Sequence, residues 1–233
     1  ARPGRARGPG GPAVTAPALP APGAPALHEL PTTLLRERVR QRLGGRRHLA
    51  DDLRIGPFPP EVTARLRPLF PPSPTPAAVL VPIVDRGEEL TVLLTERAAD
   101  LKHHPGQISF PGGRLEPGDA DPESAALRET EEEIGLARDF VEIVGRLPDH
   151  IIISGYRVTP IVALVRPGFT LRVDCTEVAC AFEAPLRHLF DPRTHVPRLR
   201  RIGAEELVTY DLPWSGHTIW GATAGMLLTL RQF

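Results

Sequence analysis

Residues 123–136 read ESAALRETEEEIGL, and this stretch says more about the fold than any other part of the sequence. At about 100° per residue in an α-helix, one face of the stretch carries apolar or small side chains, namely Leu127, Thr130 and Ile134. The opposite face carries three carboxylates, because residues three and four apart are neighbours on a helix: Glu129, Glu132 and Glu133. The stretch is therefore predicted to be an amphipathic helix that ends at Gly135.

Three carboxylates on one helix face repel one another, and a bound divalent cation would offset that repulsion. Hard cations such as Mg²⁺ and Mn²⁺ prefer oxygen ligands and often share them with substrate phosphates. A solvated charged face is the alternative reading of the same residues. The residues upstream favour the metal, because Phe110-Pro111-Gly112-Gly113 and a polar loop lead into the helix. Glycines there would let a backbone carbonyl approach an ion closely.

The overall charge excludes some functions. Lys and Arg number 28 in the 233 residues and Asp and Glu also number 28, so the net charge is zero. A generally basic nucleic-acid binder is therefore excluded, and three arginines near the start give only weak support for nucleic-acid or membrane binding. No run approaches the roughly 18 apolar residues of a membrane span. The expected partner is a small molecule, with no nucleic acid and no membrane.

The composition divides the chain into three parts. Residues 1–30 hold seven prolines and five glycines and are predicted to be a disordered tail. Residues 31–76 are predicted to be a helical lead with helices at 31–43 and 60–67, followed by a Pro-rich linker. Residues 77–233 are predicted to be the functional domain.

Within that domain, alternating and apolar patterns predict strands interleaved with helices, without the regular alternation of βαβ units. We expect an α/β fold with a mixed sheet covered by helices. The predicted strands are 78–84, 90–95, 106–110, 140–147, 157–165, 177–183 and 206–211, and a last helix covers 222–231. Cys175 and Cys180 are predicted to be buried, reduced thiols, as in a cytoplasmic protein.

The glycine-rich segment and the acidic helix, residues 113–136, resemble the Nudix box. In that motif a Gly, five residues, a Glu and seven residues precede Arg-Glu-hydrophobe-x-Glu-Glu-x-Gly-hydrophobe. The second half is complete from Arg128 to Leu136, with Thr130 at the hydrophobic position. The first half departs from the motif. Counted from Gly113, Asp119 stands at the Glu position, and eight residues rather than seven separate it from Arg128.

That extra residue resembles the coenzyme A pyrophosphatase branch of the family, and a second motif agrees. It runs from Leu93-Leu94-Thr95-x-Arg97-Ala98 through Lys102 and Gly106 to the Phe110–Gly113 turn, with Lys102 where Arg is usual. The resemblance implies a Nudix-type α/β/α sandwich with a mixed, curved β-sheet and a catalytic loop–helix–loop. It also implies hydrolysis of the coenzyme A diphosphate bond.

By the resemblance, Glu129, Glu132 and Glu133 hold Mg²⁺ or Mn²⁺ together with a glycine carbonyl, that of Gly113 or its neighbour Gly112. Arg128 orients the glutamates. Glu129 is both ligand and candidate base, and Glu177 is the alternative base; a surface role is the competing interpretation of Glu177.

The candidates for substrate contacts lie outside the box. Arg97 and Lys102 could bind the phosphates, although Arg97 could equally pair with the acidic helix. Tyr156 could stack on adenine or belong to the core. The alternatives to a coenzyme A hydrolase are a Nudix enzyme with another substrate, such as ADP-ribose, a dinucleotide or a nucleoside triphosphate, and a non-catalytic ligand-binding module. A cytoplasmic location is expected, and analogy with the family allows a homodimer.

Overall fold

The computed structural model describes residues 26–44, 53–101 and 104–232. Its centre is a nine-stranded sheet in which six strands run in the order β1-β7-β8-β2-β3-β4, while β5 pairs with β2, β6 with β8 and β9 with β3. The strands are β1 (Leu53–Arg54), β2 (Thr75–Asp85), β3 (Leu90–Arg97), β4 (Ile108–Ser109), β5 (Gly112–Arg114), β6 (Val141–Arg146), β7 (Asp149–Ile151), β8 (Tyr156–Val165) and β9 (Val178–Pro185).

Strand β2 organises the sheet. It pairs in parallel with β8 along nearly its whole length, from Thr75 to Val84. On its other side, the first half of β2 pairs with β5 and its last three residues pair with β3, both antiparallel. Helices cover both faces of this strand, so its side chains are almost continuously apolar rather than alternating. The sheet is mixed, as predicted.

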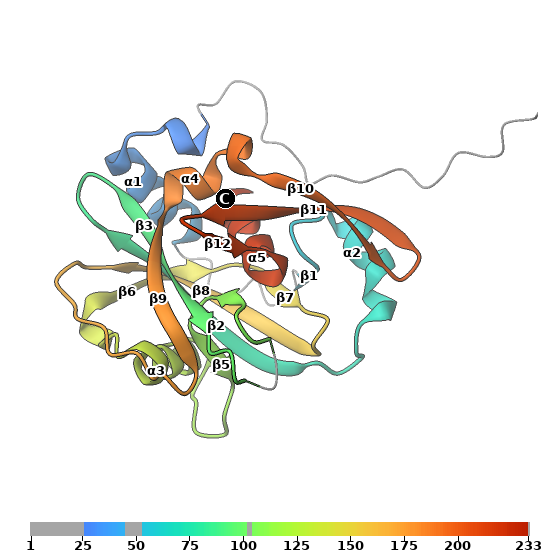
Figure 1. Cartoon of the computed structure of the whole chain (residues 1–233), viewed down its shortest axis with the longest axis horizontal. Coiled ribbons are helices and arrows are strands. Elements are labelled where there is room, and N and C mark those ends of the chain that lie inside the picture. The colour runs from blue at the N-terminus through green and yellow to red at the C-terminus, as the bar shows by residue number, and fades with distance from the viewer. Residues whose placement is uncertain (1–25, 45–52, 102–103, 233) are drawn as a thin grey trace, which may run out of the picture.

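Helices lie on both faces of the sheet (Figure 1). One face is covered by α3 (Pro122–Ile134), whose Ala125, Ala126 and Ile134 are buried against β2, β3 and β8. The other face is covered by α1 (Thr32–Leu43), α4 (Leu186–Phe190) and α5 (Gly221–Gln232), which share the larger hydrophobic core. The predicted α/β/α architecture is confirmed.

The remaining elements are at the ends of the sheet. Helix α2 (Pro60–Leu66) packs with Phe58, Ile151 and Leu207 in a third, smaller core. The strands β10 (Val196–Ile202), β11 (Glu205–Trp214) and β12 (His217–Ile219) form a separate antiparallel sheet. Short 3-10 helices connect elements at Leu27–Glu29, Arg67–Leu69, Arg138–Phe140 and Pro192–Thr194.

The end of the predicted tail is ordered. Residues 1–25 lie outside the described residues, but Leu27–Glu29 form a 3-10 helix and Leu30 is buried in the main core, so the prediction is wrong for these last residues. Helix α1, expected in a lead before the domain, buries Leu35, Val39 and Leu43 in the same core as β2 and β8. The first helix therefore belongs to the same packed unit.

The predicted helices and strands correspond to helices and strands in the structure, although the strand expected at 106–110 is only two residues long, β4. Patterning missed β1, β5, β7, β10, β12 and α4, which are mostly too short to show a period. The prediction of two buried thiols is wrong, because Cys175 is exposed in a turn and Cys180 is half-buried on β9; both are free. Among the described residues, no helix has the length and apolar character needed to cross a membrane.

Candidate active site

Helix α3 has well-defined ends. At its start, the Asp121 side chain accepts a hydrogen bond from the Ser124 N–H at 2.8 Å, and Pro122 occupies the first turn, where no backbone donor is needed. At its end, Gly135 adopts a left-handed conformation with φ of 67°, which favours glycine. These two ends fix which residues of the helix face the sheet and the preceding loop.

Gly112 and Gly113, the first two residues of β5, are called the glycine turn below, and they bring the backbone against a carboxylate of α3. A Cβ added to Gly113 would lie 2.5 Å from Oε2 of Glu129, so only glycine allows Glu129 to occupy this place. Gly112 is confined from the other side, because a Cβ there would lie 2.6 Å from the Cα of Val79 on β2. Contacts with Val79 on one side and Glu129 on the other therefore leave no room for a side chain at either glycine.

Glu133 is the buried carboxylate of the site, with 5% of its surface exposed. One of its oxygens accepts a hydrogen bond from the Gly112 N–H at 3.2 Å. Burial raises the pKa of Glu133 to about 8, while the Gly112 hydrogen bond and the positive charge of Arg97 oppose the rise. Burial also raises the pKa of the half-buried Glu129, although Arg128 acts in the opposite direction. These desolvated carboxylates would bind a cation strongly once deprotonated.

Arg128 connects four parts of the site. Its Nη1 lies 3.0 Å from Glu129 and 3.0 Å from Glu132, and its Nε and Nη2 bind the two oxygens of Asp119 at 3.1 and 3.0 Å. Its Nη2 also donates to the Arg114 carbonyl, 3.2 Å away. The salt bridges predicted between Arg128 and the glutamates are thus present for Glu129 and Glu132.

Asp119 keeps a role in the site although it departs from the motif. Its carboxylate accepts the two Arg128 hydrogen bonds and a third from the Glu116 N–H at 2.8 Å. These hydrogen bonds, with that of Arg128 the strongest, hold the pKa of Asp119 below its ordinary value. The aspartate therefore serves to hold Arg128, and through it the glutamates.

Glu132 differs from its two neighbours in the predicted set. Its side chain is 61% exposed and paired with Arg128, and within the described residues no three of these site carboxylates have oxygens within 4.8 Å of one another. The structure thus brings Glu129 and Glu133 to the glycine turn and leaves Glu132 at the surface. The donor set still fits a hard divalent cation, because it consists of carboxylates beside a backbone turn that only glycine permits.

Two further predicted residues lie at neighbouring strand ends. Arg97 ends β3 and is paired with Val178, the residue after Glu177, and the Ala98 N–H donates to the Glu177 carbonyl at 2.9 Å. The charges of both side chains reach Glu133: Arg97 lowers its pKa and Glu177 raises it. In the described part of the chain, the Arg97 guanidinium has no ion-pair or hydrogen-bond partner, so the predicted alternative of a pair with the acidic helix is not observed.

Tyr156 begins β8, and the side chain of Arg114, from β5 on the other side of β2, reaches it. Its hydroxyl accepts hydrogen bonds from Nε and Nη2 of Arg114 at 3.0 and 2.6 Å, and the guanidinium lies 5.4 Å from the ring centre. Tyr156 is therefore half-buried: its hydroxyl binds Arg114, and its side chain also packs against the main core, in line with the alternative of a core residue. Lys102, the other predicted phosphate contact, lies outside the described residues.

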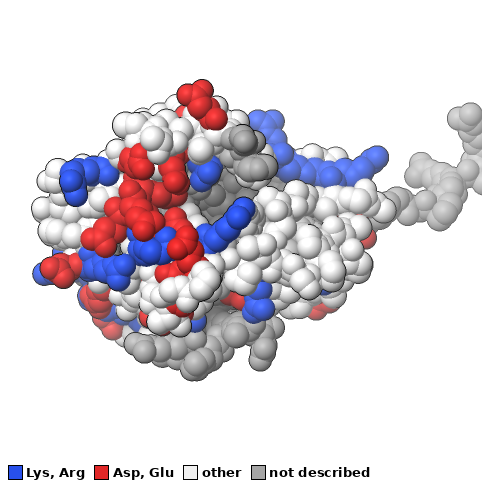
Figure 2. Space-filling model, turned by 90° about the horizontal axis from the view of Figure 1, so that it is seen from below, with Lys and Arg blue, Asp and Glu red and all other residues white. Residues whose placement is uncertain are grey.

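Arg114 is the site residue that sequence reasoning missed. It follows Gly113 directly, its carbonyl binds Arg128, and its side chain holds Tyr156. Its position immediately after the double glycine was the available signal. Seen from below, where α3 lies in Figure 1, the acidic side chains form a continuous patch with arginines among them (Figure 2). An anionic substrate would approach this patch only with cations to neutralise it.

Comparison with known proteins shows the family of this chain. The Nudix domain family matches residues 74–211. The chain is 40% identical over 156 residues to the uncharacterized Nudix hydrolase NudL of Enterobacter sp. (strain 638), covering 66% of this chain and 80% of that protein. The same values hold for NudL of Escherichia coli (strain K12).

Among solved structures, an Ap4A hydrolase binary complex from C. elegans is similar with a TM-score of 0.42 and 22% identity, over 47% of this chain and 80% of that one. A Nudix hydrolase, RenU, from M. smegmatis has a TM-score of 0.42 and 23% identity, over 48% and 71%.

The chain belongs to the Nudix family. It is a Nudix hydrolase, an enzyme that acts on a phosphorus-containing anhydride, and enzymes of this family generally use divalent metal ions such as Mg²⁺ or Mn²⁺.

Proposed function

We propose that this enzyme hydrolyses the diphosphate bond of coenzyme A or its derivatives, giving adenosine 3′,5′-bisphosphate and 4′-phosphopantetheine or its acylated form. The observation that carries the proposal is the position of Arg97, an unpaired cation among the described residues whose charge acts on buried Glu133. It belongs to the Leu93–Gly113 motif that resembles the coenzyme A branch, and that motif folds as the β3, β4 and β5 strands beside α3.

The metal site we propose consists of Glu129, Glu132 and Glu133 with the carbonyl of Gly113. Glu129 and Glu133 already face the glycine turn, and Glu132 joins them by leaving Arg128, which its exposed position allows. A bound Mg²⁺ or Mn²⁺ would neutralise the diphosphate and lower the pKa of a coordinated water. Arg128, anchored by Asp119, keeps the glutamates oriented.

Hydrolysis requires that a water oxygen attacks phosphorus, that the bridging P–O bond breaks, and that a base takes the water proton. We assign the base to the Glu129 carboxylate, since its pKa is raised by burial and one of its oxygens is held by Arg128 at 3.0 Å. Glu177 remains the alternative base; it is exposed, and it acts on the site through its charge.

The substrate contacts follow from charge. The Arg97 guanidinium suits a phosphate of the substrate, including the 3′-phosphate that distinguishes coenzyme A, and we assign Lys102 the same role. We also assign Tyr156 a stacking contact with adenine, which would take the place of the Arg114 guanidinium now 5.4 Å from the ring centre.

A hydrolysis panel with product identification tests the proposal. Coenzyme A, dephospho-coenzyme A, ADP-ribose, a diadenosine polyphosphate and nucleoside triphosphates are incubated with the full chain, with Mg²⁺, Mn²⁺ or chelator. We expect coenzyme A to have the highest kcat/KM and to need the metal. Faster cleavage of dephospho-coenzyme A and ADP-ribose than of coenzyme A would overturn the substrate assignment. Turnover in both Glu129→Gln and Glu133→Gln would contradict the metal site.

Three more assignments belong to this proposal. We propose that residues from 77 onward carry the catalytic and substrate-binding groups, with α1 packed against them in one core, and that residues 1–25 are dispensable for turnover. We also propose a cytoplasmic location, and a homodimer as the assembly to test by light scattering.

A further inference from the structure

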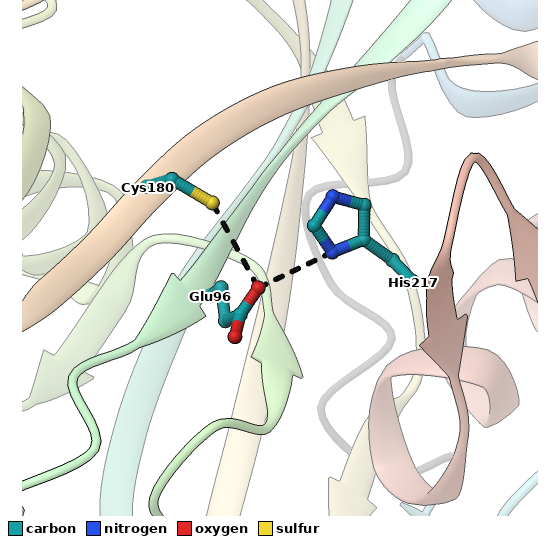
Figure 3. A group of neighbouring side chains, drawn as sticks. All are labelled: Glu96, Cys180 and His217. Carbon is teal, nitrogen blue, oxygen red and sulfur yellow. Dashed lines mark hydrogen bonds and ion pairs between the residues drawn. The ribbon is translucent and has the colours of Figure 1, made fainter.

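A second group of metal-ligating side chains lies on the opposite face of the sheet from α3. Glu96 on β3, Cys180 on β9 and His217 on β12 each offer one ligand atom, and these atoms all lie within 4.8 Å of one another. It is the one such group among the described residues, and Figure 3 shows its three side chains pointing toward a common centre. The Nudix box supplies none of them.

The strand register explains why two of the three residues meet. Glu96 and Cys180 are direct partners in the β3–β9 ladder, so their side chains project from the same face of the sheet. Two residues back along β3 and two residues forward along β9, Leu94 and Phe182 pair on the same face and pack in the main core. Glu96 and Cys180 therefore lie at the edge of that core, on the side that α5 and β12 cover.

His217 reaches the pair from a different sheet, and its ring is held in place. The imidazole stacks on Phe182 with ring centres 3.9 Å apart and planes 6° from parallel. Its Nδ1 lies 3.2 Å from Oε2 of Glu96, and the Cys180 thiol lies 3.8 Å from the same oxygen. All three side chains are partly exposed, so an ion can reach them.

We propose that Glu96, Cys180 and His217 form a binding site for a thiophilic divalent transition metal of the Zn²⁺ type. Around tetrahedral zinc, typical bond lengths place a sulfur about 3.6 Å from an oxygen ligand and a nitrogen about 3.4 Å from it. The observed separations of 3.8 and 3.2 Å are within a few tenths of an ångström of both values. A thiolate, an imidazole and a carboxylate suit Zn²⁺ better than Mg²⁺, which prefers oxygen alone.

A nucleophilic cysteine is the competing interpretation, and the geometry disfavours it. In a Cys-His-carboxylate arrangement the imidazole stands between the thiol and the acid, whereas here the carboxylate stands between the thiol and the imidazole. Burial and the negative charge of Glu96 raise the pKa of the Cys180 thiol, which is the opposite of what a nucleophile needs. Neither point counts against a metal site. A metal ion binds all three groups whatever their order, and it replaces the thiol proton.

The metal would join three elements that are distant in sequence. It would link the β12 strand to the β3–β9 ladder. The link on β3 would be at Glu96, the residue before Arg97. The expected effect is a stabilised junction between the small sheet and the central sheet, separate from the chemistry at α3.

Cobalt spectroscopy on the full chain tests this site without measuring activity. With excess Mg²⁺ present to occupy oxygen ligands, Co²⁺ is added to the reduced wild-type protein. A thiolate ligand is expected to give sulfur-to-cobalt charge-transfer absorption in the near ultraviolet, and added Zn²⁺ should abolish it. The absorption should be lost in Cys180→Ser and kept in the matched control Cys175→Ser, because Cys175 is exposed and outside the group. His217→Ala and Glu96→Gln should weaken binding at least about tenfold.

Absence of thiolate absorption in the wild type, or its persistence in Cys180→Ser, would overturn the proposal. A second readout covers the case in which Cys180→Ser does not fold. In the wild type, Zn²⁺ should slow alkylation of Cys180 by iodoacetamide but leave alkylation of Cys175 unchanged, as measured by peptide mass spectrometry. Equal rates with and without Zn²⁺ would also overturn it. Neither the cobalt absorption nor the alkylation rate depends on hydrolysis. If the enzyme does not hydrolyse coenzyme A, the proposed function fails while this metal site can still be tested.

Discussion

The guanidinium of Arg128 binds both oxygens of Asp119, with Nε 3.1 Å from Oδ1 and Nη2 3.0 Å from Oδ2. The same guanidinium keeps one nitrogen, Nη1, for Glu129 and Glu132. A planar fork can satisfy two partners in this way, whereas a lysine ammonium cannot. Asp119 replaces the Glu of the family motif and is followed by one extra loop residue. Its carboxylate nevertheless lies where it can bind Arg128.

Asp119→Asn should lower activity without unfolding the protein. The amide keeps the shape of the side chain but removes the charge that fixes Arg128, so the glutamates lose orientation. We expect apparent metal affinity or kcat to fall about 10- to 100-fold, the usual effect of disturbing residues behind metal ligands. Metal titration of turnover measures the change. Asp211→Asn is the matched control, because Asp211 also pairs with arginines, Arg198 and Arg200, but does so in the small sheet. Equal metal affinities in the wild type and Asp119→Asn would contradict the anchoring role.

Glu133→Gln and Glu129→Gln should each reduce kcat by about 100-fold or more, the loss expected when a ligand of a catalytic metal is removed. Glu131→Gln is the control on the same helix, since Glu131 is half-exposed and bound to Arg138. Circular dichroism confirms that each variant is folded. An equal loss in Glu131→Gln would show that the effect is nonspecific.

Gly113→Ala should inactivate the enzyme, while Gly118→Ala should not. The added methyl group would collide with the carboxylate of Glu129, whereas a methyl group at Gly118 has no atom within 4 Å. Both substitutions add one methyl group to a glycine of the segment that precedes α3, Gly113 in β5 and Gly118 in the loop that follows, so the comparison tests the contact with Glu129. Steady-state kinetics and thermal midpoints are measured together. Unchanged kcat in Gly113→Ala would place Glu129 elsewhere during catalysis.

The raised pKa of Glu133 predicts how the stability of the metal-free protein depends on pH. Between the ordinary value of 4.5 and about 8, the folded carboxyl keeps a proton that the unfolded chain releases. The free energy of unfolding should therefore fall as pH rises through this window, by at most about 1.4 kcal/mol per pH unit from this group. Urea unfolding in chelator at pH 5 to 8 measures the slope.

The matched control for that slope is Glu133→Gln, which removes the titrating group and should flatten the profile relative to wild type. Mg²⁺ should stabilise the wild type more at pH 8 than at pH 6, because the ion competes with the Glu133 proton. A steeper profile in Glu133→Gln than in the wild type would contradict the assignment.

Arg97→Ala should impair coenzyme A more than dephospho-coenzyme A. If the guanidinium binds the 3′-phosphate, its removal costs about 1.5–3 kcal/mol of binding, a 10- to 100-fold rise in KM for coenzyme A alone. Kinetics with both substrates measure the difference, and Arg138→Ala serves as a surface control. An equal rise for both substrates would assign Arg97 to the diphosphate instead.

The sequence was sufficient for α3, because the helical period and a C-terminal glycine are local signals, whereas the capping role of Asp121 became visible only in the structure. It placed Glu132 and Glu133 on one face but could not separate them. The burial of Glu133 depends on the Gly112 N–H, and that group is positioned by a three-residue strand too short to show alternation.

Non-local pairing was also beyond the sequence. Glu96 and Cys180 are 84 residues apart and meet only because β3 and β9 are neighbours in the sheet. His217 joins them from a strand of three residues whose place depends on a second sheet. Residue identity alone left both cysteines looking like ordinary core thiols.

The packing of α1 and α5 has a practical consequence for shortened forms of the enzyme. Both helices lie outside residues 74–211, yet their own Leu35, Leu43 and Leu227 are fully or almost fully buried in the main core. A truncated protein limited to the family-matched segment would keep only α4 of the three helices on this side of the sheet and would expose much of the main core. Each such leucine stabilises by about 1.5–3 kcal/mol, against a typical total of about 5–15 kcal/mol. Such a fragment is expected to aggregate, and recombinant work on catalysis should keep residues 26–232 together.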